Sequence, residues 1–127
     1  MGSRAFLDKN QVVDLHTEQM EFFGGQDSIR DDSLLDSAVA APIQHFCYSG
    51  DRNLFGVAAR YAFHLTKNHA FHDGNKRVGL SAALLFLKLN GIMIEGHEEI
   101  LFEEMIKLTT SETDSDKFSE IWHLLRL

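Results

Sequence analysis

The run from Val78 to Leu87, ten residues without a charge, constrains the fold of this chain more than any other feature. A helix that is apolar on every face is buried, and ten residues are too few to span a bilayer. Asn90 and Gly91 follow the run, and glycine commonly occupies the position after the last helical turn. We therefore expect a buried central helix over residues 76–90 in a soluble core.

The segment from His69 to Arg77, which reads His-Ala-Phe-His-Asp-Gly-Asn-Lys-Arg, leads into this helix. Lys76 and Arg77 would lie in the first turn, near the positive end of the helix dipole, where cations are unfavourable unless an anion binds there. The free backbone N–H groups of a helix N-terminus bind anions, and Gly74 would let the backbone approach one closely. In isolation the two cations would simply reach solvent, but the whole segment favours a phosphate-binding loop.

Several side chains of this segment could act on a bound phosphate. His69 could take a proton from a hydroxyl nucleophile, because the ordinary pKa of histidine is about 6.5. Asp73 offers the oxygen ligand that Mg²⁺ takes when phosphates supply most of the others, or it could cap the following helix. Asn75 could donate to a phosphate oxygen or cap the same helix, and Lys76 and Arg77 would neutralise phosphate charge.

Apolar residues at helical spacing predict further helices on both sides of residues 76–90. The predicted helices cover residues 6–23, a stretch from 31 to the residue before Pro42, 54–65, 101–108 and 118–125. No useful alternating run and no internal repeat occurs. We therefore expect a single domain over residues 1–127, an all-α compact bundle of about six helices around the buried central helix.

Charge and cysteine content limit the class of protein. The net charge is −7 and the basic residues are scattered, which argues against direct nucleic-acid binding. The single cysteine, Cys47, excludes an internal disulfide framework and is expected to pack in the core. The N-terminal residues lack the apolar run of a signal peptide. These features indicate a cytoplasmic protein that binds a small molecule or another protein and no membrane.

A metal-dependent phosphohydrolase is an alternative interpretation of the same residues. His72 and Asp73 are adjacent, and His69 lies three residues before His72, so the three could ligate a transition metal. That chemistry needs further ligands from neighbouring helices, and the available histidines show no tight spacing: His16, His45 and His64. The Gly-Asn-Lys-Arg continuation is unexplained by a metal site.

The segment also resembles the active-site motif of the Fic/Doc superfamily, His-x-Phe-x-Asp/Glu-Gly-Asn-x-Arg. Every fixed position is met, by His69, Phe71, Asp73, Gly74, Asn75 and Arg77. Residues 29–38 and 84–91 resemble the flanks of the death-on-curing (Doc) branch, so the resemblance covers roughly residues 6–125. It implies the compact all-α Fic/Doc fold.

Two departures from the AMP-transferring Fic enzymes favour the Doc branch. Those enzymes have glycine where this chain has Lys76, and a second arginine where this chain has Leu80. Members of the Doc branch also have a lysine at the position of Lys76. This branch is similar to toxins that phosphorylate a threonine of elongation factor Tu. The resemblance therefore implies a toxin kinase that transfers the γ-phosphate of ATP to a Thr or Ser hydroxyl, with Mg²⁺ as cofactor.

The resemblance also implies a role for each residue of the motif. His69, Asp73 and Lys76 would be catalytic, and Asp73 would hold the metal. The nucleotide phosphates would be bound by Gly74, Asn75, Lys76 and Arg77, with Lys67 as an additional contact.

Partners and two alternative functions follow from the same resemblance. The inhibitory motif of many Fic proteins, Ser/Thr-x-x-x-Glu-Gly/Asn, is not found. The resemblance thus implies a cognate antitoxin, whose disordered segment folds into a groove on binding. AMP transfer to a protein hydroxyl by the same residues is one alternative. A catalytically silent module that binds the antitoxin is another, although the complete motif argues against it.

Overall fold

The described part of the chain is helical. The structure, a computed structural model, describes residues 5–49 and 54–94 together with Gly96 and Ile100. These residues form four helices: α1 (Lys9–Phe23), α2 (Asp32–Ser49), α3 (Leu54–Asn68) and α4 (Asn75–Leu89). The all-α class is confirmed for this part. The helices predicted at 101–108 and 118–125 lie outside the described residues. The expected total of about six helices therefore stays a prediction.

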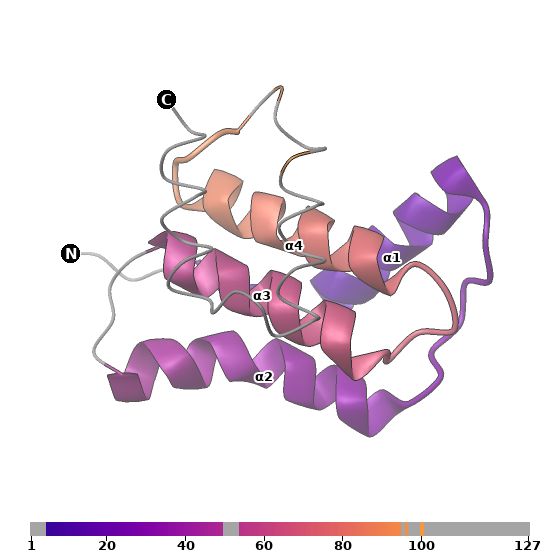
Figure 1. Ribbon diagram of the computed structural model, residues 1–127, viewed down its shortest axis with the longest axis horizontal. Coiled ribbons are helices and arrows are strands. Elements are labelled where there is room, and N and C mark those ends of the chain that lie inside the picture. Colours follow the sequence, from indigo (N-terminus) through magenta and orange to yellow (C-terminus); the bar gives the residue numbers. More distant parts are fainter. Residues whose placement is uncertain (1–4, 50–53, 95, 97–99, 101–127) are drawn as a thin grey trace.

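The four helices form two adjoining layers of one core. In Figure 1, α2, α3 and α4 lie side by side with α3 in the middle, and α1 passes behind α4. The core is built mainly from α3 and α4, whose small residues let the two helices approach closely. The fully buried residues of α3 are Val57, Ala58, Ala59, Tyr61, Ala62 and Leu65.

The prediction that residues 76–90 form the central helix is not confirmed within the described residues. α4 spans residues 75–89, as the pattern indicated, and it buries a stripe that includes Val78, Ala82 and Phe86. Leu80 and Leu84, however, are only partly buried. Because α3 lies between α2 and α4, α3 has the more central place among these four helices.

The ends of α1 are set by local hydrogen bonds. The Asp8 carboxylate accepts the Gln11 backbone N–H at 2.8 Å, and the Gln11 side chain accepts the Asp8 N–H at 2.9 Å. This reciprocal capping box satisfies two N–H groups that a helix start would leave free. α1 therefore begins at Lys9 rather than near residue 6. It ends where the Gly24 N–H donates to Met20 O, as the two glycines predicted.

The expectation that the second helix ends before Pro42 is wrong, because α2 continues through the proline to Ser49. Proline lacks an N–H, so one i→i−4 hydrogen bond of this helix is missing. The apolar face nevertheless continues past it, with Ala38, Val39 and Pro42 all buried. Burial of this face against α3 offsets the lost hydrogen bond.

Gly79 marks a close approach of α4 to α3. A Cβ atom at this position would lie 2.6 Å from Thr66 Oγ1 and 2.9 Å from the Ala62 carbonyl oxygen. Because backbone atoms cannot swing aside, we expect Gly79→Ala to lower the free energy of unfolding by about 2 kcal/mol, despite the higher helix propensity of alanine. Urea unfolding measures this change. Lys88→Ala, at an exposed position of α4, is the control, and equal stability of the two variants would contradict the prediction.

His64 on α3 makes the fold sensitive to acid. Burial, together with the smaller effects of the charges of Arg60, Lys67 and His45, lowers the pKa of His64 from 6.5 to about 4. The unfolded chain therefore binds more protons than the folded one between these two values, so stability falls as the pH drops from about 6.5 to about 4. We expect His64→Gln to lose less stability over this range than the wild type in urea unfolding. Equal losses would show that other groups cause the acid sensitivity.

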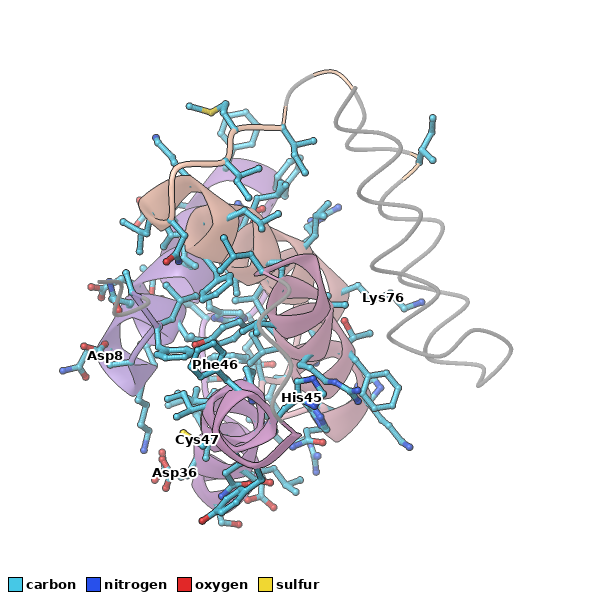
Figure 2. All side chains as sticks on the ribbon, turned by 90° about the vertical axis from the view of Figure 1, so that its left-hand side faces the viewer. Asp8, Asp36, His45, Phe46, Cys47 and Lys76 are labelled. Atoms are coloured by element: carbon cyan, nitrogen blue, oxygen red, sulfur yellow. The ribbon has the colours of Figure 1, made fainter. Side chains whose placement is uncertain are left out.

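The surface of the described part corrects one further expectation. Cys47 is exposed rather than packed in the core, one position after Phe46, which does pack on the core (Figure 2). Among the helices described, none combines the length and the apolar character that crossing a membrane requires.

Candidate active site

The loop between α3 and α4 is held against the segment that joins α1 to α2. The N–H groups of Arg30 and Asp31 both donate to the Ala70 carbonyl, at 2.7 and 3.0 Å, and the His72 N–H donates to Ser28 O at 3.2 Å. Ile29 and Phe71 form an antiparallel bridge between the two segments. A fixed backbone of this kind can hold functional side chains in defined positions.

His69 lies at the start of the loop, directly after the last residue of α3. Its backbone has a φ of +51°, the left-handed conformation. Histidine, asparagine and aspartate adopt this conformation more readily than most non-glycine residues, but at a cost in free energy. The side chain is exposed, so its imidazole can meet a second molecule.

A buried histidine on α1 contacts two residues of the loop between α3 and α4. The His16 ring stacks on the Phe71 ring, with centroids 3.7 Å apart, and its Nε2 lies 2.6 Å from the Asp73 carbonyl oxygen, to which it donates. Its Nδ1 lies 3.3 Å from a carboxylate oxygen of Asp27. Both nitrogens are thus engaged within the chain, so His16, considered above as a spare metal ligand, instead fixes the loop.

The Asp73 carboxylate faces outward beside the same loop. One of its oxygens, Oδ2, accepts the Gln26 backbone N–H at 2.9 Å. The other accepts no hydrogen bond from the described residues, and the side chain is exposed. The side chain of Asp73 does not cap α4, whose N-cap is Gly74 and has no side-chain cap. The capping role considered for Asp73 is therefore wrong, and its role as a metal ligand stays a prediction.

Gly74 is favoured by its backbone conformation, and a larger residue there would also displace a neighbouring side chain. Its φ of +76° is left-handed, and a Cβ atom there would collide with the end of the Met20 side chain. α4 begins directly after it, and the first hydrogen bond is donated by the Val78 N–H to Gly74 O. The N–H groups of residues 75–77 have no acceptor among the described residues, which leaves three donors for an anion at this helix end.

The side chain of Asn75 is used inside the loop. Its Oδ1 accepts the Phe71 N–H at 3.1 Å, its Nδ2 donates to Phe71 O at 3.0 Å, and the residue is buried. This pair of hydrogen bonds closes the turn over residues 71–75. The side chain therefore does not cap α4.

The cations of the site differ in how they are held. Lys76 is exposed and extends outward from α4 (Figure 2). The Arg77 guanidinium lies over the Phe23 ring at the end of α1, 4.2 Å from its centroid, in a cation–π contact. Lys67 lies over Phe63 on its own helix, 5.1 Å from the ring centroid. Of these three described cations, Arg77 is thus the one held by a contact with a different helix.

The described part of the chain contains no ligand set for the metal-dependent phosphohydrolase considered as an alternative. No three of its histidine, cysteine, aspartate and glutamate side chains are grouped so as to hold a metal ion. The exposed imidazole of His69, the Asp73 oxygen that accepts no hydrogen bond from the described residues and the cationic N-terminus of α4 belong to one short segment, and such groups can move a proton and stabilise negative charge.

Comparison with known proteins agrees with the motif. The profile of the Fic/DOC family matches residues 6–87. The chain is 36% identical over 118 residues to "Toxin Doc" of Mycolicibacterium smegmatis (strain ATCC 700084 / mc(2)155), an alignment that covers 90% of this chain and 88% of that protein. It is 28% identical over 94 residues to "Protein kinase doc" of Escherichia phage P1, covering 74% of this chain and 75% of that protein.

Proposed function

The chain belongs to the Fic/DOC family and to its Doc branch, and from this membership we propose that it is a toxin that acts as a protein kinase. In this proposal it transfers the γ-phosphate of ATP to a Ser or Thr hydroxyl of a translation factor, with Mg²⁺ as cofactor. One observation carries the proposal. The exposed His69 and the Asp73 oxygen that accepts no hydrogen bond from the described residues lie on the same short loop, which ends at the α4 N–H groups that have no acceptor in that part of the chain.

The residues fit a bound nucleotide and metal. The N–H groups of residues 75–77 and the Arg77 guanidinium would bind phosphate oxygens, and the free oxygen of Asp73 would be a ligand of Mg²⁺. Mg²⁺, when bound, neutralises negative charge on the phosphates. Met20 and His16, which lie under the loop, keep these groups in place without a role in the chemistry.

His69 is the proposed general base. In the transfer step the hydroxyl oxygen of the target forms a bond to the γ-phosphorus, and the bond from that phosphorus to the β,γ-bridging oxygen breaks, which releases ADP. The proton of the hydroxyl passes to the imidazole of His69. The exposed position of this side chain suits a substrate that is itself a folded protein.

Two residues of α4 favour phosphate transfer over AMP transfer. Lys76 places a cation in the first turn, and Leu80 packs its side chain partly against the core, where the AMP-transferring enzymes have a second arginine. A cation is therefore missing from the second turn of α4, so fewer groups are available to hold the distal phosphates as a leaving group. AMP transfer to a protein hydroxyl by the same residues remains the second candidate.

The proposed partners are a target and an inhibitor. We propose elongation factor Tu, or a similar translation factor, as the target, and a cognate antitoxin whose disordered segment folds on binding as the inhibitor. The relative named as a toxin supports the second proposal.

Induced expression in a bacterial host tests the toxin function. We expect incorporation of labelled methionine into protein to stop soon after induction of the wild-type chain, and to continue after induction of a His69→Asn variant at the same level. Continued protein synthesis with the soluble wild-type chain would contradict the proposed function. Equal arrest by both chains would instead favour the catalytically silent, binding role.

A further inference from the structure

The side chain of Arg30 reaches from the α1–α2 segment to the end of α3. Its Nε donates to the His69 carbonyl oxygen at 2.7 Å, and one of its terminal nitrogens lies 3.5 Å from the Asn68 carbonyl oxygen. These are carbonyl groups that the end of a helix leaves without an intrahelical donor. A cation at a helix C-terminus is also favoured by the helix dipole. The guanidinium thus caps α3 at the residue that bears the proposed base.

The conformation of His69 needs such a contact. A non-glycine residue keeps a left-handed backbone conformation only where surrounding contacts hold it there. His69 is such a residue, with a φ of +51°. Arg30 binds the carbonyls of two successive peptide groups, since its side chain donates to the His69 carbonyl while its backbone N–H donates to the Ala70 carbonyl. The side chain of His69 is exposed, and among the described residues no hydrogen bond to its imidazole holds it.

The guanidinium makes no ion pair with a described carboxylate. The neighbouring carboxylate, Asp31, is used for a different purpose: it accepts the Ser33 hydroxyl at 2.7 Å and the Leu34 N–H at 3.1 Å, and so caps α2. The side chain of Asn68, at the end of α3, also contacts α2, by donating to Leu34 O at 3.0 Å. The Asp31 carboxylate and the Asn68 side chain are therefore bonded to α2, whereas the Arg30 guanidinium contacts the carbonyls of His69 and Asn68 at the end of α3.

We infer that Arg30 is a positioning residue for phosphate transfer: it holds His69 in its left-handed conformation and so aims the imidazole at the target hydroxyl. Arg30 itself touches no substrate in this inference, which rests on the proposed function. Small displacements of a catalytic group reduce the rate of a bound complex more than they reduce binding. The loss of Arg30 should therefore lower kcat and leave the KM for ATP nearly unchanged.

Kinetics of Arg30→Ala and Arg30→Lys test the inference. With γ-labelled ATP and purified elongation factor Tu as the target, we expect the kcat of Arg30→Ala to fall by about 10²-fold. Its KM for ATP should stay within about threefold of the wild-type value. Lysine keeps the positive charge but lacks the planar fork of the guanidinium, so Arg30→Lys should recover part of the rate. Lys9→Ala is the matched control, since it removes ion pairs from Lys9 to Asp32 and Asp36 at the start of the same helix α2. An unchanged kcat in Arg30→Ala, or a fall equal to that of the control, would overturn the inference.

A second measurement needs no transfer activity. The backbone ¹³C carbonyl resonance of His69 should shift in Arg30→Ala, where a hydrogen bond to that carbonyl is lost, and stay in place in Lys9→Ala. The same His69 resonance in all three proteins would show that Arg30 does not hold this residue. If the wild type transfers no phosphate, the proposed function fails, and this comparison still decides whether Arg30 sets the conformation of His69.

Discussion

Replacing His69 by asparagine is expected to lower the rate of phosphate transfer by about 10³-fold while the fold stays intact. The side chain is exposed and serves only the target hydroxyl in this proposal, so little else depends on it. Asparagine tolerates the left-handed backbone at φ +51° and has no basic nitrogen to accept the proton. Single-turnover transfer from γ-labelled ATP measures the rate, and urea unfolding measures the stability.

His69→Ala separates the chemistry from the backbone. The left-handed conformation is less favourable for alanine than for asparagine. We therefore expect the free energy of unfolding of this variant to be lower than that of His69→Asn by about 1 kcal/mol. The two variants should nevertheless be equally inactive, because neither can take a proton. Transfer at the wild-type rate by His69→Asn would remove His69 from the mechanism.

The second large effect is expected from Asp73→Asn. The asparagine oxygen can still accept the Gln26 N–H, so the loop should keep its position. The negative charge that would bind Mg²⁺ is lost, and we expect transfer to fall by about 10²-fold at low Mg²⁺ and to recover in part as Mg²⁺ is raised.

A titration of the transfer rate against Mg²⁺ measures this effect. Asp14→Asn, which removes an exposed carboxylate from α1, has the same change of charge and serves as the control. The wild type and the control should saturate at a lower Mg²⁺ concentration than Asp73→Asn. Identical titration curves for all three proteins would exclude Asp73 as the metal ligand.

Local patterns predicted the helices and the loop well where local forces decide them. The bounds of α4 follow from an uncharged run ended by Asn90 and Gly91, and the helical spacing of apolar residues placed α3 over residues 54–65, three residues short of its observed end. The prediction for α2 stopped before Pro42, but the helix continues because its buried face extends past the proline. The relative burial of α3 and α4 depends on packing between helices, which a single stretch of sequence does not contain.

The supports of the site were missed because their partners are distant in sequence. His16 binds the carbonyl of a residue 57 positions away, and Arg30 reaches one 39 positions away. One signal for His16 was present, since it falls between Val12 and Met20 on the buried stripe of α1, where a polar side chain needs a partner. Arg30 is exposed, and neither its charge nor its spacing distinguishes it from a solvated arginine.

Transfer from ATP labelled separately at the α- or the γ-phosphate tests the kinase proposal most directly. Purified wild-type protein is incubated with a bacterial lysate and Mg²⁺, with His69→Asn as the control. We expect one band at the size of elongation factor Tu that carries the γ-label only and is absent with the variant. A band that carries the α-label would contradict the kinase and identify an AMP transferase, and no band with either label would contradict both transfer reactions.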